Sequence, residues 1–291
     1  MTKQEFQKLT EQGVVLLDGA TGSNLRKAGM PVGVSSELWN LEHPEVISAL
    51  QRAYMEAGSQ IIYAPTFTAN RISLGMHGLQ NRVEELNTRL VNLAKSTLKE
   101  GAYIAGDLTT TGRMLEPRGD ISYQELLDVY KEQIVALANA GVDLLVAETM
   151  IDIDETLVVL DAAQAVCDLP VMCSMTLEAD GNALYGGNAV EMVETLQEFG
   201  ASAVGLNCSV GPDQLEAVVG SMKAVAKVPV IAKPNAGMPV IDENGIAHYN
   251  MDAEHFAVSM KKLVEKGAGV IGGCCGTDPE YIRAVARILG R

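Results

Sequence analysis

Basic residues are scarce in this sequence. Its 291 residues include 22 Lys and Arg against 37 Asp and Glu, which gives a formal net charge of −15 at pH 7. A protein that binds nucleic acid or an anionic membrane needs a basic surface to neutralise phosphates. The charge balance therefore argues against both kinds of partner and indicates an acidic, solvated surface.

Long apolar runs are also missing. The first residues, Met1 to Phe6, contain no apolar signal-peptide core, and no uncharged run further along is long enough to span a bilayer. We therefore expect a cytoplasmic protein. With 47% hydrophobic and 20% charged residues, the composition is that of a folded globular chain with a large core, and the length suits a single α/β barrel.

Cysteine is too rare for a disulfide framework, because the chain has only five. In a reducing compartment, cysteines in such small and odd number are more often metal ligands or catalytic groups. Cys167 and Cys173 fall at an expected helix end and inside an expected strand, where we expect buried structural residues. The other three stand out by their context: Cys208 lies in an Asn-Cys-Ser sequence, and Cys274 and Cys275 lie between glycines.

Apolar and amphipathic segments alternate along the whole chain. The expected strands cover residues 14–18, 60–65, 103–108, 144–148, 171–176, 203–208, 229–233 and 269–273. The expected helices cover residues 44–57, 82–100, 122–140, 154–166, 189–199, 212–225, 253–266 and 279–289. A further short helix begins the chain, where Thr2 and Glu5 are spaced as a capping box.

Eight strand–helix units fit either a closed (βα)8 barrel or a doubly wound open sheet. The count of eight favours the barrel, and the turn after the first strand lacks the third glycine of a dinucleotide-binding fingerprint. Connections after the strands are long and those before them are short, which places the functional loops at the carboxyl ends of the strands. We predict one α/β domain over residues 1–291, a (βα)8 TIM barrel with a short N-terminal helix.

Polar side chains end most of these strands and would face one mouth of the barrel. They are Asp18, Thr66, Asp107, Glu148, Cys208, Asn235, Cys274 and Cys275. Three thiols brought together there would hold a metal with one exchangeable position. Their softness favours zinc, whereas an iron–sulfur cluster usually needs a fourth cysteine. A substrate thiol that enters such a site loses its proton.

Two carboxylates at the mouth suit the ammonium group of an amino acid. These are Asp18 and Glu148, and the backbone of residues 19–22 offers N–H groups to the substrate carboxylate. The alternatives are a turn-forming role for Asp18 and an internal ion pair for Glu148. Trp39, the only tryptophan, either covers the mouth or offers a cation–π face to a sulfonium or quaternary ammonium donor.

Taken together, these motifs resemble the homocysteine S-methyltransferase family, in particular the N-terminal homocysteine-binding module of cobalamin-dependent methionine synthase. The matching segments are Leu17–Gly22, Pro65–Phe67, Glu148-Thr149, Gly205–Ser209, Pro234–Gly237 and Gly272–Thr277. The resemblance implies zinc on Cys208, Cys274 and Cys275, with the homocysteine sulfur as fourth ligand and Asn235 in its place when substrate is absent. It also implies a homocysteine pocket formed by Asp18, Gly19, Ala20, Thr21, Thr66, Phe67 and Glu148.

The reaction that the resemblance implies is methyl transfer to the homocysteine thiolate, giving methionine. The expected donor is methylcobalamin on a separate corrinoid protein or module. S-methylmethionine and betaine, used by single-domain relatives, are the alternative donors, and Trp39 is their only support. The chain ends at Arg291, soon after the last expected helix, and both a stand-alone enzyme and an excised module agree with that.

Two other classes of function stay open at this point. The first is a non-catalytic zinc-binding partner subunit, against which the carboxylates of Asp18 and Glu148 beside the cysteines argue. The second is a redox enzyme that uses Cys274 and Cys275 as a vicinal pair. Neighbouring Cα atoms lie only about 3.8 Å apart, which is shorter than the usual span of a disulfide.

Overall fold

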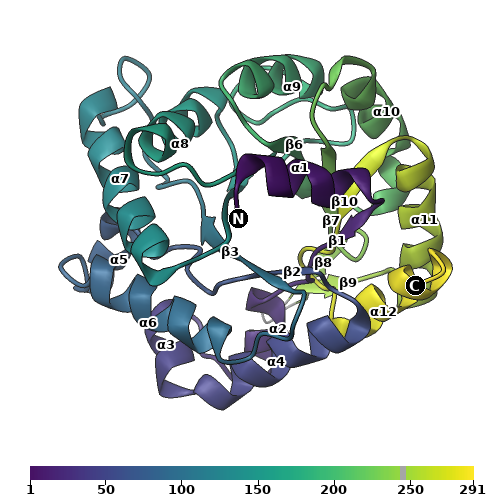
Figure 1. Ribbon diagram of the computed structural model, residues 1–291, viewed down its shortest axis with the longest axis horizontal. Coiled ribbons are helices and arrows are strands. Elements are labelled where there is room, and N and C mark those ends of the chain that lie inside the picture. Colours follow the sequence, from purple (N-terminus) through teal and green to yellow (C-terminus); the bar gives the residue numbers. More distant parts are fainter. Residues whose placement is uncertain (243–246) are drawn as a thin grey trace.

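The computed structural model describes residues 1–242 and 247–291 and consists of a parallel barrel enclosed by helices (Figure 1). The barrel strands are β1 (Val15–Leu16), β2 (Ile61–Tyr63), β3 (Tyr103–Leu108), β4 (Leu144–Met150), β5 (Val171–Met175), β6 (Ala203–Cys208), β7 (Val230–Pro234) and β10 (Ala268–Ile271). They are neighbours in the order β1-β10-β7-β6-β5-β4-β3-β2. A parallel bridge between Leu17 and Ile61 joins the two edge strands. The predicted barrel is confirmed.

The helices follow the strands in the alternation that the sequence predicts. They are α1 (Lys3–Glu11), α2 (Gly22–Lys27), α3 (Ser36–Glu42), α4 (Pro44–Ala57), α5 (Arg71–Gly75), α6 (Val83–Lys95), α7 (Tyr123–Ala140), α8 (Ile153–Val166), α9 (Ala189–Glu198), α10 (Glu216–Val225), α11 (Ala253–Glu265) and α12 (Pro279–Ile288), with a 3-10 turn η1 at Pro212–Gln214. Within the described parts of the chain, no helix is both long and apolar enough to cross a membrane.

Two apolar layers hold the barrel together. Alternate strand residues such as Val146 and Met172 fill its interior, and their neighbours pack outward against the helices. The capping box of Thr2 and Glu5 starts α1 as predicted. This helix lies across the end of the barrel where the strands begin (Figure 1). Its buried Phe6 side chain belongs to the interior core. The opposite end, where the strands finish, is left for the site.

The long connections after the strands contain elements that the sequence did not predict. The connection after β1 carries α2 and α3, the one after β2 carries α5, and the one after β7 carries the antiparallel hairpin of β8 (Pro239–Ile241) and β9 (Ala247–Tyr249). Residues 243–246, inside that last connection, lie outside the described residues. All these additions are at the carboxyl ends of the strands, as expected for the functional side of a barrel.

Candidate active site

A cavity of about 310 Å³ lies among the loops at the carboxyl ends of the strands. Its wall contains the acidic and sulfur side chains expected at the barrel mouth, and one lysine: Asp18, Asp107, Glu148, Cys208, Cys274, Cys275 and Lys233. Leu25, Tyr63 and Phe67 provide apolar surface between them. The cavity is thus concave and partly apolar, with a few convergent polar groups, as small-molecule sites usually are.

Three cysteine sulfurs meet at one side of this cavity. Cys208 is the last residue of β6, and Cys274 and Cys275 follow the end of β10. Their sulfur atoms all lie within 4.8 Å of one another, and each side chain is half-buried. Cys208 has a left-handed φ of 62°, which is uncommon for a residue with a Cβ atom. Such strain is typical of functional sites, where the surrounding structure maintains it.

Glycine makes the sharp turn after β10 sterically possible. A Cβ atom on Gly272 would lie 2.6 Å from the carbonyl oxygen of Asp18, and one on Gly273 would lie 2.5 Å from Thr277 Oγ1. The Cys274 N–H group donates to the carbonyl oxygen of Pro234 at the end of β7. Strand β7 therefore fixes the backbone of the loop that presents two of the three sulfurs.

The donor set fits a zinc ion. At a Zn–S distance of about 2.3 Å, tetrahedral thiolates lie about 3.8 Å apart, which agrees with the 4.8 Å limit on the sulfur separations. Hydrogen bonds with the other two thiols lower the pKa of Cys275 to about 3, whereas the same contacts and burial raise the pKa of Cys208, so one thiolate is shared among the three sulfurs. Among the described residues, this is the only group of three His, Cys, Asp or Glu side chains with the spacing of a metal site.

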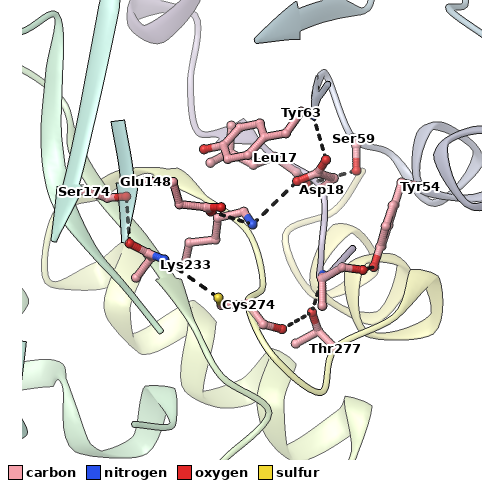
Figure 2. A network of polar contacts seen from close by, with 12 residues as sticks. Leu17, Asp18, Tyr54, Ser59, Tyr63, Glu148, Ser174, Lys233, Cys274 and Thr277 are labelled. Atoms are coloured by element: carbon pink, nitrogen blue, oxygen red, sulfur yellow. Dashed lines mark hydrogen bonds and ion pairs between the residues drawn. The ribbon is translucent and has the colours of Figure 1, made fainter. Parts of the chain in front are cut away.

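Asn207 links the sulfur cluster to a buried hydrogen-bond network. Its buried side-chain oxygen accepts hydrogen bonds from the Thr149 N–H group (2.9 Å) and the Ser174 hydroxyl (2.8 Å). Its amide nitrogen donates to Thr149 Oγ1 (2.7 Å) and, more weakly, to Cys274 Sγ (3.8 Å). Figure 2 shows this chain of contacts running from Ser174 to Cys274. The sequence signal for this role was the position of Asn207 directly before Cys208.

A buried lysine joins the two carboxylates predicted to bind an ammonium group. Lys233 Nζ lies 3.0 Å from Glu148 Oε1 and 3.6 Å from Asp18 Oδ1, and Figure 2 shows it between them. All three side chains are less than 10% exposed. The internal ion pair considered as an alternative for Glu148 is therefore present. Lys233 itself was missed as a site residue, because a lysine near a strand end usually points to solvent.

Burial and charge act on these groups in opposite directions. Burial raises the pKa of Asp18 to about 6, against the lowering effect of Lys233 and of a hydrogen bond from the Tyr63 N–H group. Burial also raises the pKa of Glu148. For Lys233, burial alone lowers the pKa, but Glu148 and Asp18 outweigh it and hold the pKa well above its usual value. Lys233 is therefore an ammonium ion at neutral pH.

The backbone after β1 presents donors to the cavity. The Ala20 N–H group donates to Thr277 Oγ1 (3.1 Å), and the Ala20 carbonyl oxygen accepts from the Tyr54 hydroxyl (2.7 Å). The N–H groups of Gly19 and Thr21 have no acceptor among the described residues, and both residues line the cavity. This turn can supply hydrogen bonds to a carboxylate.

Two further predicted residues are buried, and one of them, Thr66, does not line the cavity as predicted. Thr66 is fully buried behind the cavity wall, where its hydroxyl bonds to the backbone of Asp107, so of the predicted Thr66 and Phe67 pair only Phe67 lines the cavity. Asn235 is buried and donates to the Ser209 carbonyl oxygen, and its own side-chain oxygen has no hydrogen-bond partner among the described residues.

Trp39 does not face the cavity. It belongs to α3, packs against Leu25, Met30 and Ile47, and stacks on the His43 ring at 4.4 Å between centroids. Its apolar contacts outside the barrel explain this position. Trp39 thus contributes no cation–π face to the site, and the sequence argument for a sulfonium or quaternary ammonium donor is lost.

The chain is similar to known proteins over most of its length. The chain is similar to the methionine synthases of Mycobacterium leprae (28% identity over 96% of this chain) and Mycobacterium tuberculosis (29% over 94%), and it spans only 24% of the length of each. The homocysteine methyltransferase MmuM from Escherichia coli shares the fold. Its oxidized form has a TM-score of 0.81 at 22% identity, covering 97% of this chain and 98% of that one, and its metallated form has a TM-score of 0.78.

A family model agrees over almost the whole barrel. The model described as homocysteine S-methyltransferase matches residues 15–289, from the first strand to the end of the last helix. The matched range spans the positions of the three cysteines, the acidic residues and Lys233. The chain belongs to the homocysteine S-methyltransferase family.

Proposed function

We propose that this barrel binds homocysteine beside a zinc ion held by Cys208, Cys274 and Cys275, and transfers a methyl group to the homocysteine sulfur. The observation that carries the proposal is the convergence of three cysteine sulfurs on the same cavity as buried carboxylates. A thiolate cluster suits the substrate thiol, and carboxylates suit an ammonium group. Homocysteine carries both groups on one short chain.

The residues of the barrel have separate tasks in this proposal. Zinc bound to the three cysteines would act as a Lewis acid that keeps the substrate thiol deprotonated. This matters because a free thiol with a pKa of about 8.5 is only a few per cent ionised at neutral pH. Glu148 accepts hydrogen bonds from the substrate ammonium, and the Gly19 and Thr21 N–H groups donate to the substrate carboxylate. Phe67 and Leu25 cover the methylene groups and exclude water.

Asn235 is proposed as the fourth ligand of the zinc ion in the absence of substrate. Its buried side-chain oxygen lacks a partner among the described residues, and such an atom is costly unless something binds it. An amide oxygen is a weak ligand for zinc compared with thiolate. A homocysteine thiolate should therefore displace it.

For the methyl donor we propose a methylcorrinoid carried by another module or protein. Support comes from the longer methionine synthases, of which this chain matches about a quarter, and from the buried position of Trp39, which removes the argument for S-methylmethionine or betaine. With a net charge of −15, the acidic surface suits a basic partner protein.

Metal analysis tests the zinc site. The purified protein should contain about one zinc per chain. Cys208→Ala should lose the zinc, because the two remaining thiolates are too few to hold it. Cys167→Ala is the matched control, since Cys167 is half-buried at the end of α8 and should keep the metal. A full zinc content in Cys208→Ala would contradict the proposed ligand set.

A panel of donors tests the reaction. Homocysteine should be offered with methylcobalamin, with methyl-folate plus a corrinoid protein, with S-methylmethionine and with betaine, and methionine should be measured. We expect product with the corrinoid donors. Product from S-methylmethionine or betaine alone would overturn the proposed donor but keep the acceptor. A zinc-loaded protein that makes no methionine with any donor would favour the non-catalytic subunit.

A further inference from the structure

The cavity contains a third carboxylate, for which the sequence analysis predicted no role. Asp107, in β3, lines the cavity and is only 5% exposed. Its side chain accepts no hydrogen bond from any described residue, and its Oδ1 atom is completely buried. A buried carboxylate without a partner is destabilising, so the position of Asp107 needs an explanation outside protein stability.

The backbone around Asp107 holds this side chain in place. The Thr66 hydroxyl accepts from the Asp107 N–H group (3.1 Å) and donates to its carbonyl oxygen (2.9 Å). On the preceding residue, a Cβ atom at Gly106 would lie 3.1 Å from Leu137, so the strand is tightly packed against α7. The carboxylate is therefore presented by a rigid strand, as binding groups usually are.

The other two carboxylates already have a cation. Lys233 contacts both Asp18 and Glu148 and is an ammonium ion. Three buried carboxyl groups face one lysine, so the cavity can accommodate a second cation. Burial, followed by the charges of Glu148 and Asp18, raises the pKa of Asp107 well above its usual value, while Lys233 lowers it. No ion pair joins Asp107 to Lys233 or to another cation among the described residues, so its carboxylate lacks a direct positive partner.

We infer that Asp107 is a substrate-binding residue that accepts a hydrogen bond from the ammonium group of the amino-acid substrate, together with Glu148. In this arrangement Lys233 stays between Glu148 (3.0 Å) and Asp18 (3.6 Å) as their shared counter-ion, and Asp107 supplies the additional negative charge that the substrate ammonium requires. The inference rests on the proposed function, because it requires that the cavity binds an amino acid. It gives the site a preference for substrates that carry an ammonium group.

The test compares two ligands that differ only by the amino group. Homocysteine and 4-mercaptobutanoate should be titrated into the zinc-loaded protein by calorimetry. The wild-type protein should prefer homocysteine by about 10- to 100-fold, the effect of a charge-assisted hydrogen bond. Asp107→Asn should lose most of this preference by weakening homocysteine alone. Asp168→Asn, an exposed aspartate on the loop before β5, is the matched control.

A structural role for Asp107 would give different results. Because its carboxylate has no partner, Asp107→Asn should melt at the wild-type temperature or higher, and Asp107→Ser serves as a second variant. In turnover, KM for homocysteine should rise about 10-fold or more with little change in kcat. Equal weakening of both ligands, or an undiminished preference for homocysteine, would overturn the inference. A wild-type protein that binds no homocysteine would overturn the proposed function as well.

Discussion

Removal of the buried lysine is the most direct perturbation of this site. In Lys233→Met a side chain of similar length loses its charge, and Asp18 and Glu148 lose the ammonium group that lies 3.6 Å and 3.0 Å away. Lys233 is only 4% exposed, so water cannot replace it. Loss of one partner from a buried ion pair typically costs about 3–5 kcal/mol. For a domain of this size, that is about 10 °C in melting temperature.

The loss should depend on pH in a defined direction. The pKa of Asp18 is about 6 in the folded protein, above its usual value of 3.8, so the folded state binds the proton more tightly and stability falls as pH rises from about 4 to 6. Lys233 lowers the pKa of both Asp18 and Glu148, and its removal raises both further. In the variant, the two carboxyl groups are then neutral at low pH, and at high pH they carry negative charges without a counter-ion.

Urea denaturation at pH 5.5, 7 and 8 measures this effect. The difference in unfolding free energy between wild type and Lys233→Met should be small at pH 5.5 and reach its full value at pH 8. Lys262→Met removes an exposed ion pair with Glu216 at 3.3 Å and should cost about 0–1 kcal/mol at every pH. A loss below about 1 kcal/mol at pH 8 for Lys233→Met, or one that is independent of pH, would refute the reasoning.

Two further predictions concern the turn after β1. Gly19→Ala should lower the unfolding free energy by about 1–3 kcal/mol in urea denaturation, because its Cβ atom would lie 2.7 Å from the Tyr54 hydroxyl and 2.8 Å from Thr277 Oγ1. The control is Gly22→Ala, which has open space around it, and equal losses in the two variants would contradict the steric explanation. Thr277→Val should cost about 1–3 kcal/mol, because the Ala20 N–H group loses its acceptor. A loss below about 0.5 kcal/mol would mean that this bond is unimportant.

Local sequence patterns were sufficient for the barrel itself. Eight apolar segments alternate with amphipathic ones, and helix α4 ends at Gly58 and α7 at Gly141, both in the left-handed conformation expected there. Parallel strands in a barrel finish at one end, so Cys208 and the Cys274–Cys275 pair could be placed together without coordinates. The extra helices and the hairpin in the long loops were not predicted, since short segments in loops depend on what they pack against.

The sequence by itself determined the fold and which chemical groups reach the mouth of the barrel. Only the tertiary structure decided their partners: Lys233 lies between two carboxylates, Thr66 turns away from the cavity, Trp39 joins a separate apolar cluster, and Asp107 is left without a cation. The physical reason is the range of the interactions. Strands, helices and caps follow from neighbours within a few residues, whereas ion pairs and buried hydrogen bonds join side chains that are far apart along the chain.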